Sequence, residues 1–357
     1  MRIGIYDPYL DDAGGGEKYM MTIAECLSKN HDVDIFWDDK QDIKIISDRF
    51  GLDLSKTRLV KNIFSKDTSI VKRIPETKKY DALIILSDGS IPLTLSKKTF
   101  IHIQQPLPHI SPNLRSGLKL KKINAVFCNS QFTKSFIDKE LNIKSFVLYP
   151  PVDIKMKNLK KENIILTVGR FRAKDVITGI DDYKKLPVMI NAFKTLVKAG
   201  LKNWKFILAV SVKDKDKDAF WDLEKVAEDF PIEFLVNKSN DELWESYSKA
   251  KIYWHASGFG EDLNVHPEFA EHFGISTVEA MGAGAVPVVI NRGGQKEIVK
   301  EGITGFLWDT LEQLEQKTLE LVGNDKLMSK LSGNAKEDSK NFSKQKFCDE
   351  INNLISK

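Results

Sequence analysis

The stretch from Pro267 to Val299, which reads PEFAEHFGISTVEAMGAGAVPVVINRGGQKEIV, restricts the possible folds more than any other part of the chain. Its segment STVE has the S/T-x-x-E form of a capping box and predicts a helix that opens at Ser276. Small residues end that helix, and the apolar run Val286–Ile290 predicts a buried strand of a parallel sheet. A pair of glycines then leads into a second helix near Gln295. The stretch therefore predicts a helix–strand–helix unit of an α/β fold.

The same stretch has the chemistry of an anion site between two carboxylates. The start of a helix offers unpaired N–H groups and the positive end of the dipole, and Gly274 lets a ligand approach the backbone closely. Glu271 and Glu279, with seven residues between them, would repel phosphate but can accept hydrogen bonds from hydroxyls on either side of a diphosphate. A nucleotide diphosphate sugar fits this arrangement. The alternative is a strand–helix unit with no ligand.

This stretch resembles the E-x7-E signature of glycosyltransferase family 4, a family of retaining enzymes with the GT-B fold. The form with His272 is similar to bacterial and archaeal hexosyltransferases and to mannosyltransferases of lipid-linked oligosaccharide assembly. The resemblance implies that Glu271 contacts the donor sugar and that Glu279 contacts the ribose hydroxyls. A local role for Glu279, accepting from the Ser276 N–H in the capping box, stays open. The residues of the turn that the resemblance assigns to substrate binding are Phe273, Gly274, Ile275 and Ser276.

The chain has 357 residues, which is too long for one ordinary core and predicts two domains. Hydrophobic and charged contents of 42% and 29% are typical of a soluble globular protein. The resemblance implies two Rossmann-like domains whose parallel sheets face each other across a cleft. We expect an acceptor domain at 1–155, a donor domain at 156–338, and a terminal helix at 339–357 that crosses back to the first domain.

The first domain opens with a strand, a glycine loop and a helix, which is the outline of a phosphate-binding unit without the G-x-G-x-x-G spacing. The resemblance places Gly15 and Gly16 near the donor phosphate or the acceptor; a turn that simply needs glycine is the alternative. His102 ends a predicted strand and matches a family position close to the donor sugar, although a lone His is more often structural. The expected strands are Arg2–Tyr6, Val33–Trp37, Tyr80–Leu86, Thr99–Ile103, Ala125–Asn129 and Phe146–Val152.

The second domain opens with a strand that runs directly into Gly169-Arg170. This turn resembles the family's V-G-R, whose Arg holds the donor diphosphate, and the planar guanidinium suits phosphate oxygens. The family's partner Lys corresponds to Lys184, but the loop before it is longer than usual. Lys185 and Lys174 therefore remain alternatives. The expected strands are Ile164–Val168, Phe206–Val210, Ile232–Val236, Ile252–His255, Val286–Ile290 and Gly305–Trp308.

The distribution of charge along the chain bears on its partners. Residues 49–79 hold nine basic and three acidic residues among apolar ones, and LKLKKI at 118–123 repeats the mixture. These segments fit a peripheral contact with an anionic membrane, or ordinary solvated helix faces.

Three distant cysteines predict a reducing cytoplasm, with no disulfide framework and no zinc site. The N-terminus lacks the apolar run of a signal peptide, so we expect a cytoplasmic protein, peripheral at the inner face of the membrane if that contact exists.

Metals and nucleic acids are not expected as partners. The KDKDKD segment at 213–218 contains Asp-x-Asp twice, but its lysines would oppose a cation, and the family needs no metal at the donor site. No recognisable nucleic-acid-binding module is present. The nucleotide diphosphate sugar is a co-substrate, and no other cofactor is expected.

The resemblance implies a metal-independent, retaining glycosyltransferase with Glu271 and His102 at the reacting sugar. It would move a hexose, with mannose or glucose favoured, from GDP-mannose, UDP-glucose or a similar donor to a glycan or lipid-linked saccharide, as in polysaccharide biosynthesis. Two alternatives remain open. One is a glycosyltransferase-like subunit that binds a nucleotide sugar without turnover, and the other is a nucleotide-sugar epimerase of the same fold.

Overall fold

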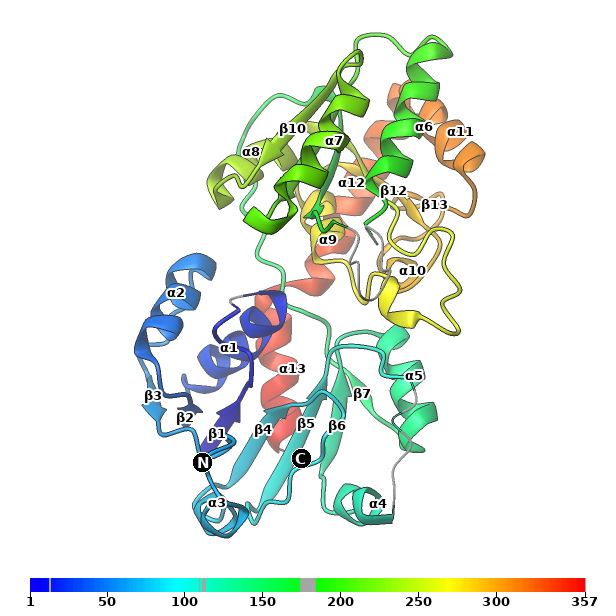
Figure 1. Cartoon of the computed structure of the whole chain (residues 1–357). Helices are drawn as coiled ribbons and strands as arrows, with labels where there is room; N and C mark the ends of the chain where they lie inside the picture. Colours follow the sequence, from blue (N-terminus) through cyan, green and yellow to red (C-terminus); the bar gives the residue numbers. More distant parts are fainter. Residues whose placement is uncertain (13, 109, 111–113, 174–183, 357) are drawn as a thin grey trace. The chain divides into compact units, whose positions relative to one another are not determined.

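The protein consists of two compact units in the computed structural model, which describes residues 1–357 except 13, 109, 111–113, 174–183 and 357 (Figure 1). Unit 1 comprises Met1–Pro151 together with Lys344–Lys357, and unit 2 comprises Val152–Ser343. The chain therefore leaves unit 1 after Pro151 and returns to it at Lys344.

Unit 1 is built on a seven-stranded parallel sheet with the order β3-β2-β1-β4-β5-β6-β7. Its strands are β1 Arg2–Tyr6, β2 Asp32–Phe36, β3 Thr57–Val60, β4 Ala82–Leu86, β5 Lys98–Ile103, β6 Ala125–Cys128 and β7 Phe146–Val147. All five residues of β4 are buried, as a strand covered on both faces requires. The predicted α/β fold with a parallel sheet is confirmed here.

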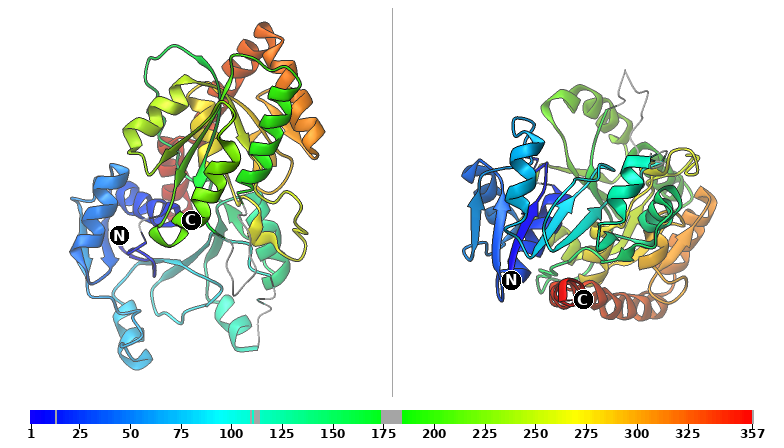
Figure 2. Two further views of the ribbon diagram at one scale, coloured as in Figure 1. Left: turned by 45° about the horizontal axis from the view of Figure 1, so that its top comes forward. Right: turned by 90° about the horizontal axis from the view of Figure 1, so that it is seen from below.

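Alternate residues of the strands fill two separate cores, one on each face of the sheet. Ile84 packs in a cluster with Ile23 and Ile351, whereas its neighbour Ile85 packs in a second cluster with Ile137. Helices accordingly cover both faces (Figure 2). The helices of unit 1 are α1 Gly15–Leu27, α2 Lys40–Phe50, α3 Ile70–Thr77, α4 Leu114–Leu120, α5 Gln131–Leu141 and α13 Lys344–Ser356.

The terminal helix α13 packs beside α1 and is fastened to it covalently (Figure 1). Cys26 of α1 and Cys348 of α13 form a disulfide, and Lys344 pairs with Glu25 at 2.5 Å. The expectation that the cysteines form no disulfide is therefore wrong. The two residues lie 322 positions apart in the sequence, so only the packing of the last helix against the first brings them together. Cys128 is free and buried.

We expect removal of this disulfide to lower the free energy of unfolding by about 2–4 kcal/mol, because the bond closes a very long loop in the unfolded chain. The test is thermal unfolding of the double variant Cys26→Ala/Cys348→Ala beside the wild type, with and without a reductant. Reductant should lower the melting temperature of the wild type and leave the variant unchanged. A wild-type melting temperature that does not respond to reductant would contradict the prediction.

Unit 2 has a six-stranded parallel sheet with the order β10-β9-β8-β11-β12-β13. Its strands are β8 Glu162–Arg170, β9 Lys205–Ser211, β10 Ile232–Val236, β11 Ala250–His255, β12 Val286–Ile290 and β13 Phe306–Trp308. Its helices are α6 Leu186–Lys198, α7 Lys217–Ala227, α8 Asn240–Lys249, α9 Ile275–Gly282, α10 Gln295–Ile298, α11 Leu311–Val322 and α12 Asp325–Ser339. Short 3₁₀ turns occur at η1 Asp214–Asp216, η2 Pro267–Phe269 and η3 Lys340–Phe342.

Several predicted element ends differ from the structure, and two of the differences have a local reason. Helix α9 begins at Ile275 with Gly274 as its N-cap, so Ser276 lies inside the first turn instead of capping it. Strand β7 contains only Phe146–Val147, although Val152 was the predicted end. The two prolines that follow lack the N–H groups that a longer strand pairing would need.

Each sheet has one point at which the strand order reverses, and these points locate the candidate sites. In unit 1 the reversal lies between β1 and β4, and in unit 2 it lies between β8 and β11. In open parallel sheets, ligands bind outside the carboxyl ends of the strands at such a reversal. The side chains that follow β1, β4, β8 and β11 are therefore the first to consider.

Candidate functional site

A charged cluster occupies the strand reversal of unit 2. Strand β8 ends at Arg170, and the neighbouring strand β11 ends at His255. Oε2 of Glu271, just beyond η2, accepts a hydrogen bond from Lys184 Nζ at 2.6 Å and lies 3.0 Å from His255 Nε2. Three segments that are distant in sequence thus meet at one carboxylate.

His255 holds Glu271 from the buried side. The main-chain N–H of Ser257 lies 3.4 Å from Nδ1, which makes Nδ1 the acceptor and leaves the proton on Nε2 to donate to Glu271. Burial lowers the pKa of His255, so the ring is neutral at neutral pH. No sequence motif assigns His255 to the site. Its position at the carboxyl end of a strand beside the reversal is the signal that could have found it.

Glu271 is ionised in this setting. Burial alone would raise the pKa of its carboxyl group, but Lys184 and His255 outweigh burial and hold the pKa well below its ordinary value. Its side chain keeps 20% of its surface exposed. A carboxylate that is charged, fixed and still accessible is suited to accept hydrogen bonds from ligand hydroxyls.

The structure separates two of the three candidate lysines. An atom placed at the Cβ position of Gly169 would lie 3.4 Å from the side chain of Lys184. The lysine side chain therefore lies over the end of β8, beside Arg170. Lys185 instead pairs with Glu261 at 2.5 Å. Lys174 lies outside the described residues. Of the two candidate lysines that the structure describes, Lys184 is the one in the cluster.

Close packing of glycines shapes the turn before α9. Gly274 has a φ of +119°, and an added Cβ would come within 2.8 Å of Gln295 Nε2. The N–H of Gly294 donates to the carbonyl of Glu271 at 2.8 Å, and an added Cβ at Gly294 would overlap the backbone of Phe273. The E-x7-E turn and the later glycine pair thus form one interlocked structure, in which side chains at these positions would displace Glu271.

Two buried tyrosines fix the first turn of α9. The hydroxyl of Tyr247 on α8 donates to Glu279 Oε2 at 2.8 Å, and that of Tyr253 on β11 donates to Ser276 Oγ at 2.8 Å. Burial raises the pKa of both phenols, so both remain protonated donors. Glu279 is therefore positioned from the core at the start of the helix, where a carboxylate can also accept from a ligand.

The predicted residues of unit 1 meet where α1 crosses the end of β5. An added Cβ at Gly16 would overlap the side chain of Gln104, two residues beyond His102. His102 is completely buried and packs against the rings of Tyr19 and Phe127, at centroid distances of 4.2 and 4.8 Å. Burial lowers its pKa to about 3, so the ring is neutral.

Carboxyl groups surround the glycine loop of unit 1. The N–H of Gly14 donates to Glu17 Oε2 at 2.5 Å, so one main-chain donor of the loop is already used. Asp7, which follows β1, is completely buried, and burial raises its pKa to about 8. Gly15 is exposed at the start of α1. This environment suits neutral hydroxyl groups better than phosphate.

Within the part of the chain that the structure describes, no group of three or more His, Cys, Asp or Glu side chains is placed to hold a metal ion. Asp216 of the KDKDKD segment is buried, and its Oδ1 accepts from the N–H of Ala173 at 3.2 Å. This aspartate therefore has a structural contact.

Comparison with known proteins identifies the family. The family model described as "Glycosyl transferases group 1" matches residues 152–338, which includes the whole charged cluster. The chain belongs to this family. A group 1 relative from Dictyostelium discoideum, GDP-Man:Man(3)GlcNAc(2)-PP-Dol alpha-1,2-mannosyltransferase, is 27% identical over 272 residues. That match covers 72% of this chain and 50% of the relative, so this chain spans about half the length of that protein.

A second group 1 relative matches over nearly the full length of both chains. It is GalNAc-alpha-(1->4)-GalNAc-alpha-(1->3)-diNAcBac-PP-undecaprenol alpha-1,4-N-acetyl-D-galactosaminyltransferase of Campylobacter jejuni, which is 25% identical over 93% of this chain and 92% of its own length. Among solved structures, Anabaena HepE in complex with UDP and glucose superimposes with a TM-score of 0.71 at 17% identity, covering 100% of this chain and 99% of HepE. The predicted GT-B fold is confirmed by this likeness.

Proposed function

We propose that this protein is a retaining glycosyltransferase that moves a hexose from a nucleotide diphosphate sugar to a hydroxyl of a lipid-linked saccharide. The cluster of Glu271, Lys184 and His255 at the strand reversal of unit 2 carries the proposal. It combines a fixed carboxylate for sugar hydroxyls with a cation beside Arg170. Membership of the family and the donors and acceptors named for its relatives support it.

In this proposal the donor diphosphate lies against Arg170, Lys184 and the main-chain N–H groups at the start of α9. These groups would offset the negative charge that grows on the leaving diphosphate, which is electrostatic stabilisation by fixed donors. The side chain of Lys184 passes Gly169 at the end of β8, and its ammonium binds Glu271, so this residue can serve the sugar side and the phosphate side together. Glu271 then orients the sugar and Glu279 binds the ribose.

The remaining assignments rest on the resemblance. His102 would contribute from unit 1 to the site of the donor sugar, and the loop of Gly15 and Gly16 would meet acceptor hydroxyls. Mannose or glucose on GDP or UDP is the favoured donor. Turnover without a metal and retention of the anomeric configuration belong to the same proposal.

A lipid-linked acceptor would bring the protein to a membrane surface, and we propose a peripheral contact at the inner face. The relatives named above act on saccharides linked to PP-Dol or PP-undecaprenol. The described residues form no helix with the length and apolar character needed to cross a bilayer. Unit 1 exposes apolar side chains within its basic segments, with 61%, 81% and 59% of Ile70, Val71 and Leu118 accessible. Such residues beside lysines suit an anionic surface.

The experiment that tests the proposed function is thermal unfolding of the wild type and Glu279→Ala across a panel of GDP- and UDP-sugars. A donor at about 100 times its dissociation constant should add roughly 2.7 kcal/mol to the free energy of unfolding. We expect stabilisation by one nucleotide class and a weaker response in the variant. A well-folded sample that responds to no nucleotide sugar would contradict the proposal.

Turnover separates the proposal from its two alternatives. A transferase should form a product only when a saccharide acceptor is added, and the anomeric configuration of that product is read by NMR. An epimerase would convert the donor without any acceptor. A subunit that only binds would give stabilisation without product.

A further inference from the structure

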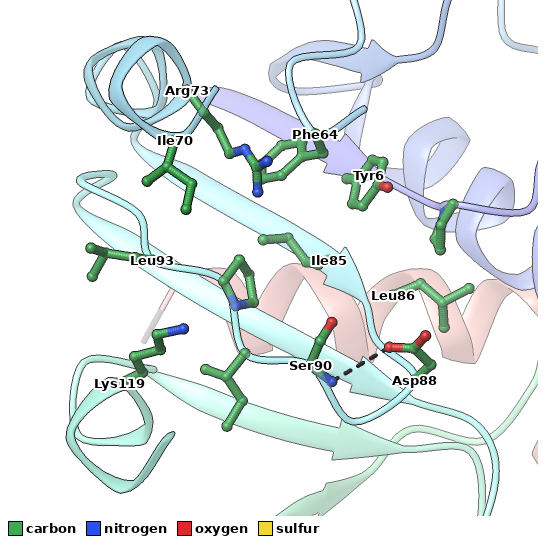
Figure 3. A pocket seen from close by; sticks show the side chains of 13 residues that line it. Tyr6, Phe64, Ile70, Arg73, Ile85, Leu86, Asp88, Ser90, Leu93 and Lys119 are labelled. Carbon is green, nitrogen blue, oxygen red and sulfur yellow. Dashed lines mark hydrogen bonds between the residues drawn. The ribbon is translucent and has the colours of Figure 1, made fainter. Parts of the chain in front are cut away.

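A cavity of about 320 Å³ opens at the strand reversal of unit 1 (Figure 3). Tyr6, the last residue of β1, and Leu86, the last residue of β4, both line it. The reversal lies between these two strands, so the cavity occupies the place in this sheet that the charged cluster occupies in the sheet of unit 2. Its volume is within the range of small-molecule sites.

Two cations enter one end of this cavity from different helices. Arg73 projects from α3 and Lys119 from α4, whereas Asp88 lies at the opposite end (Figure 3). Among the described residues, neither cation pairs with a carboxylate. Arg73 donates to the carbonyl of Thr68 at 3.3 Å, and its Nε is buried without a hydrogen-bond partner in the described part of the chain. A buried, unused guanidinium donor is costly unless an anion binds it.

Part of the wall beside the two cations is apolar, whereas Asp88 and Ser90 line the other end of the cavity. Phe64 and Ile85 line the interior, and the guanidinium of Arg73 lies 5.7 Å from the centre of the Phe64 ring. Ile70 and Leu93 line the mouth, with 61% and 37% of their surfaces exposed. An apolar chain bound here would cover the side chains of Ile70 and Leu93, which are exposed to water.

We infer that this cavity binds the phosphate-bearing end of an amphiphile, with the phosphate against Arg73 and Lys119 and the first part of an apolar chain against Phe64, Ile70 and Leu93. The inference rests on the proposed lipid-linked acceptor and names the residues that hold its lipid phosphate. It differs from general attraction to a membrane because it requires particular cations and an apolar wall.

The test is titration of the whole chain with farnesyl diphosphate, below its micelle concentration and followed by calorimetry, beside inorganic diphosphate and farnesol. GDP and UDP are present at saturation, so that the diphosphate site proposed for unit 2 is filled. We expect farnesyl diphosphate to bind at least about tenfold more tightly than either fragment, because both halves of the cavity contribute. Equal affinity for inorganic diphosphate would overturn the inference, because the apolar wall would then play no part. Equal affinity for farnesol would also overturn the inference, because Arg73 and Lys119 would then contribute nothing to binding.

Matched variants identify the residues involved. Arg73→Gln and Lys119→Gln should each weaken farnesyl diphosphate binding by about tenfold, which is the loss of one charged contact. Ile70→Ser should weaken binding of farnesyl diphosphate but not of inorganic diphosphate. The control is Lys72→Gln, which removes the neighbouring, exposed charge on α3 that does not line the cavity. An equal loss in Lys72→Gln would overturn the inference in favour of non-specific attraction.

Binding of farnesyl diphosphate can be tested separately from binding of the nucleotide sugar. Each variant should keep the wild-type melting temperature and its response to the nucleotide sugar, which shows that unit 2 is intact. A chain that responds to nucleotide sugars but not to farnesyl diphosphate would refute this inference and leave the proposed function standing. A chain that binds farnesyl diphosphate but no nucleotide sugar would refute the proposed function alone.

Discussion

Replacement of Glu271 by Gln is expected to lower kcat by about 100-fold, the loss typical of one fixed electrostatic group at a reacting centre. Gln keeps the shape of Glu but removes the charge that holds Lys184 at 2.6 Å and accepts from His255. The variant should therefore bind the sugar less well and should no longer hold Lys184 in place. Initial rates at saturating donor and acceptor measure the effect.

Matched measurements separate this role from simple damage to the fold. The control is Glu268→Gln, because Glu268 is a neighbouring carboxylate that pairs with His266 at the surface. It should keep nearly full activity. Stabilisation by the free nucleoside diphosphate should fall by less than kcat in Glu271→Gln, because Arg170 and the main-chain N–H groups at the start of α9 would still hold the diphosphate when Lys184 is displaced. A kcat within about threefold of the wild type, well short of the loss expected for such a group, would remove Glu271 from the site.

Replacement of Asp7 by Asn is expected to stabilise the protein increasingly as pH rises. Burial raises the pKa of this carboxyl from 3.8 to about 8, with Glu17 and Asp11 adding to the effect. Since the folded pKa lies above the unfolded one, the contribution of Asp7 to stability is complete below pH 3.8 and is lost as pH rises towards 8. The difference between variant and wild type should therefore grow by about 4 kcal/mol from pH 4 to pH 7.

Denaturant unfolding at several pH values measures this difference directly. Asp12→Asn is the control, because it removes an exposed carboxylate from the same loop and should show no such trend. A constant difference between Asp7→Asn and the wild type across this range would show that Asp7 is ionised in the folded protein. The transferase activity of Asp7→Asn then shows whether the neutral carboxyl group of Asp7 also contributes to binding of the acceptor.

Much of the fold could be predicted because its strands are continuous apolar runs. Strands Ile232–Val236 and Val286–Ile290 are predicted and observed with the same limits. The segment from 40 to 79 gave no such signal, yet it contains α2, β3 and α3. Only Ile46 of α2 is buried, so its pattern is almost that of a solvated surface.

In the candidate site, residues within sequence motifs could be predicted, whereas residues brought in by the fold could not. Arg170, Glu271 and Glu279 stand in short motifs, and the motif alone suggests their roles. His255 and Tyr247 carry no motif, because they reach Glu271 and Glu279 only after parallel pairing brings β11 beside β8. The cavity beside Arg73 depends on three loops and two helices, and no local pattern in the sequence encodes such an arrangement.

The disulfide gives the chain the form of a covalent ring. Both cysteines belong to unit 1, while every residue of unit 2, from 152 to 343, lies between them in sequence. A protease that cuts once anywhere in unit 2 would therefore leave two fragments still joined, and the mass of the nicked protein would rise only by one water. The cut becomes visible on a gel only after reduction, so apparent resistance to proteolysis must be judged under reducing conditions.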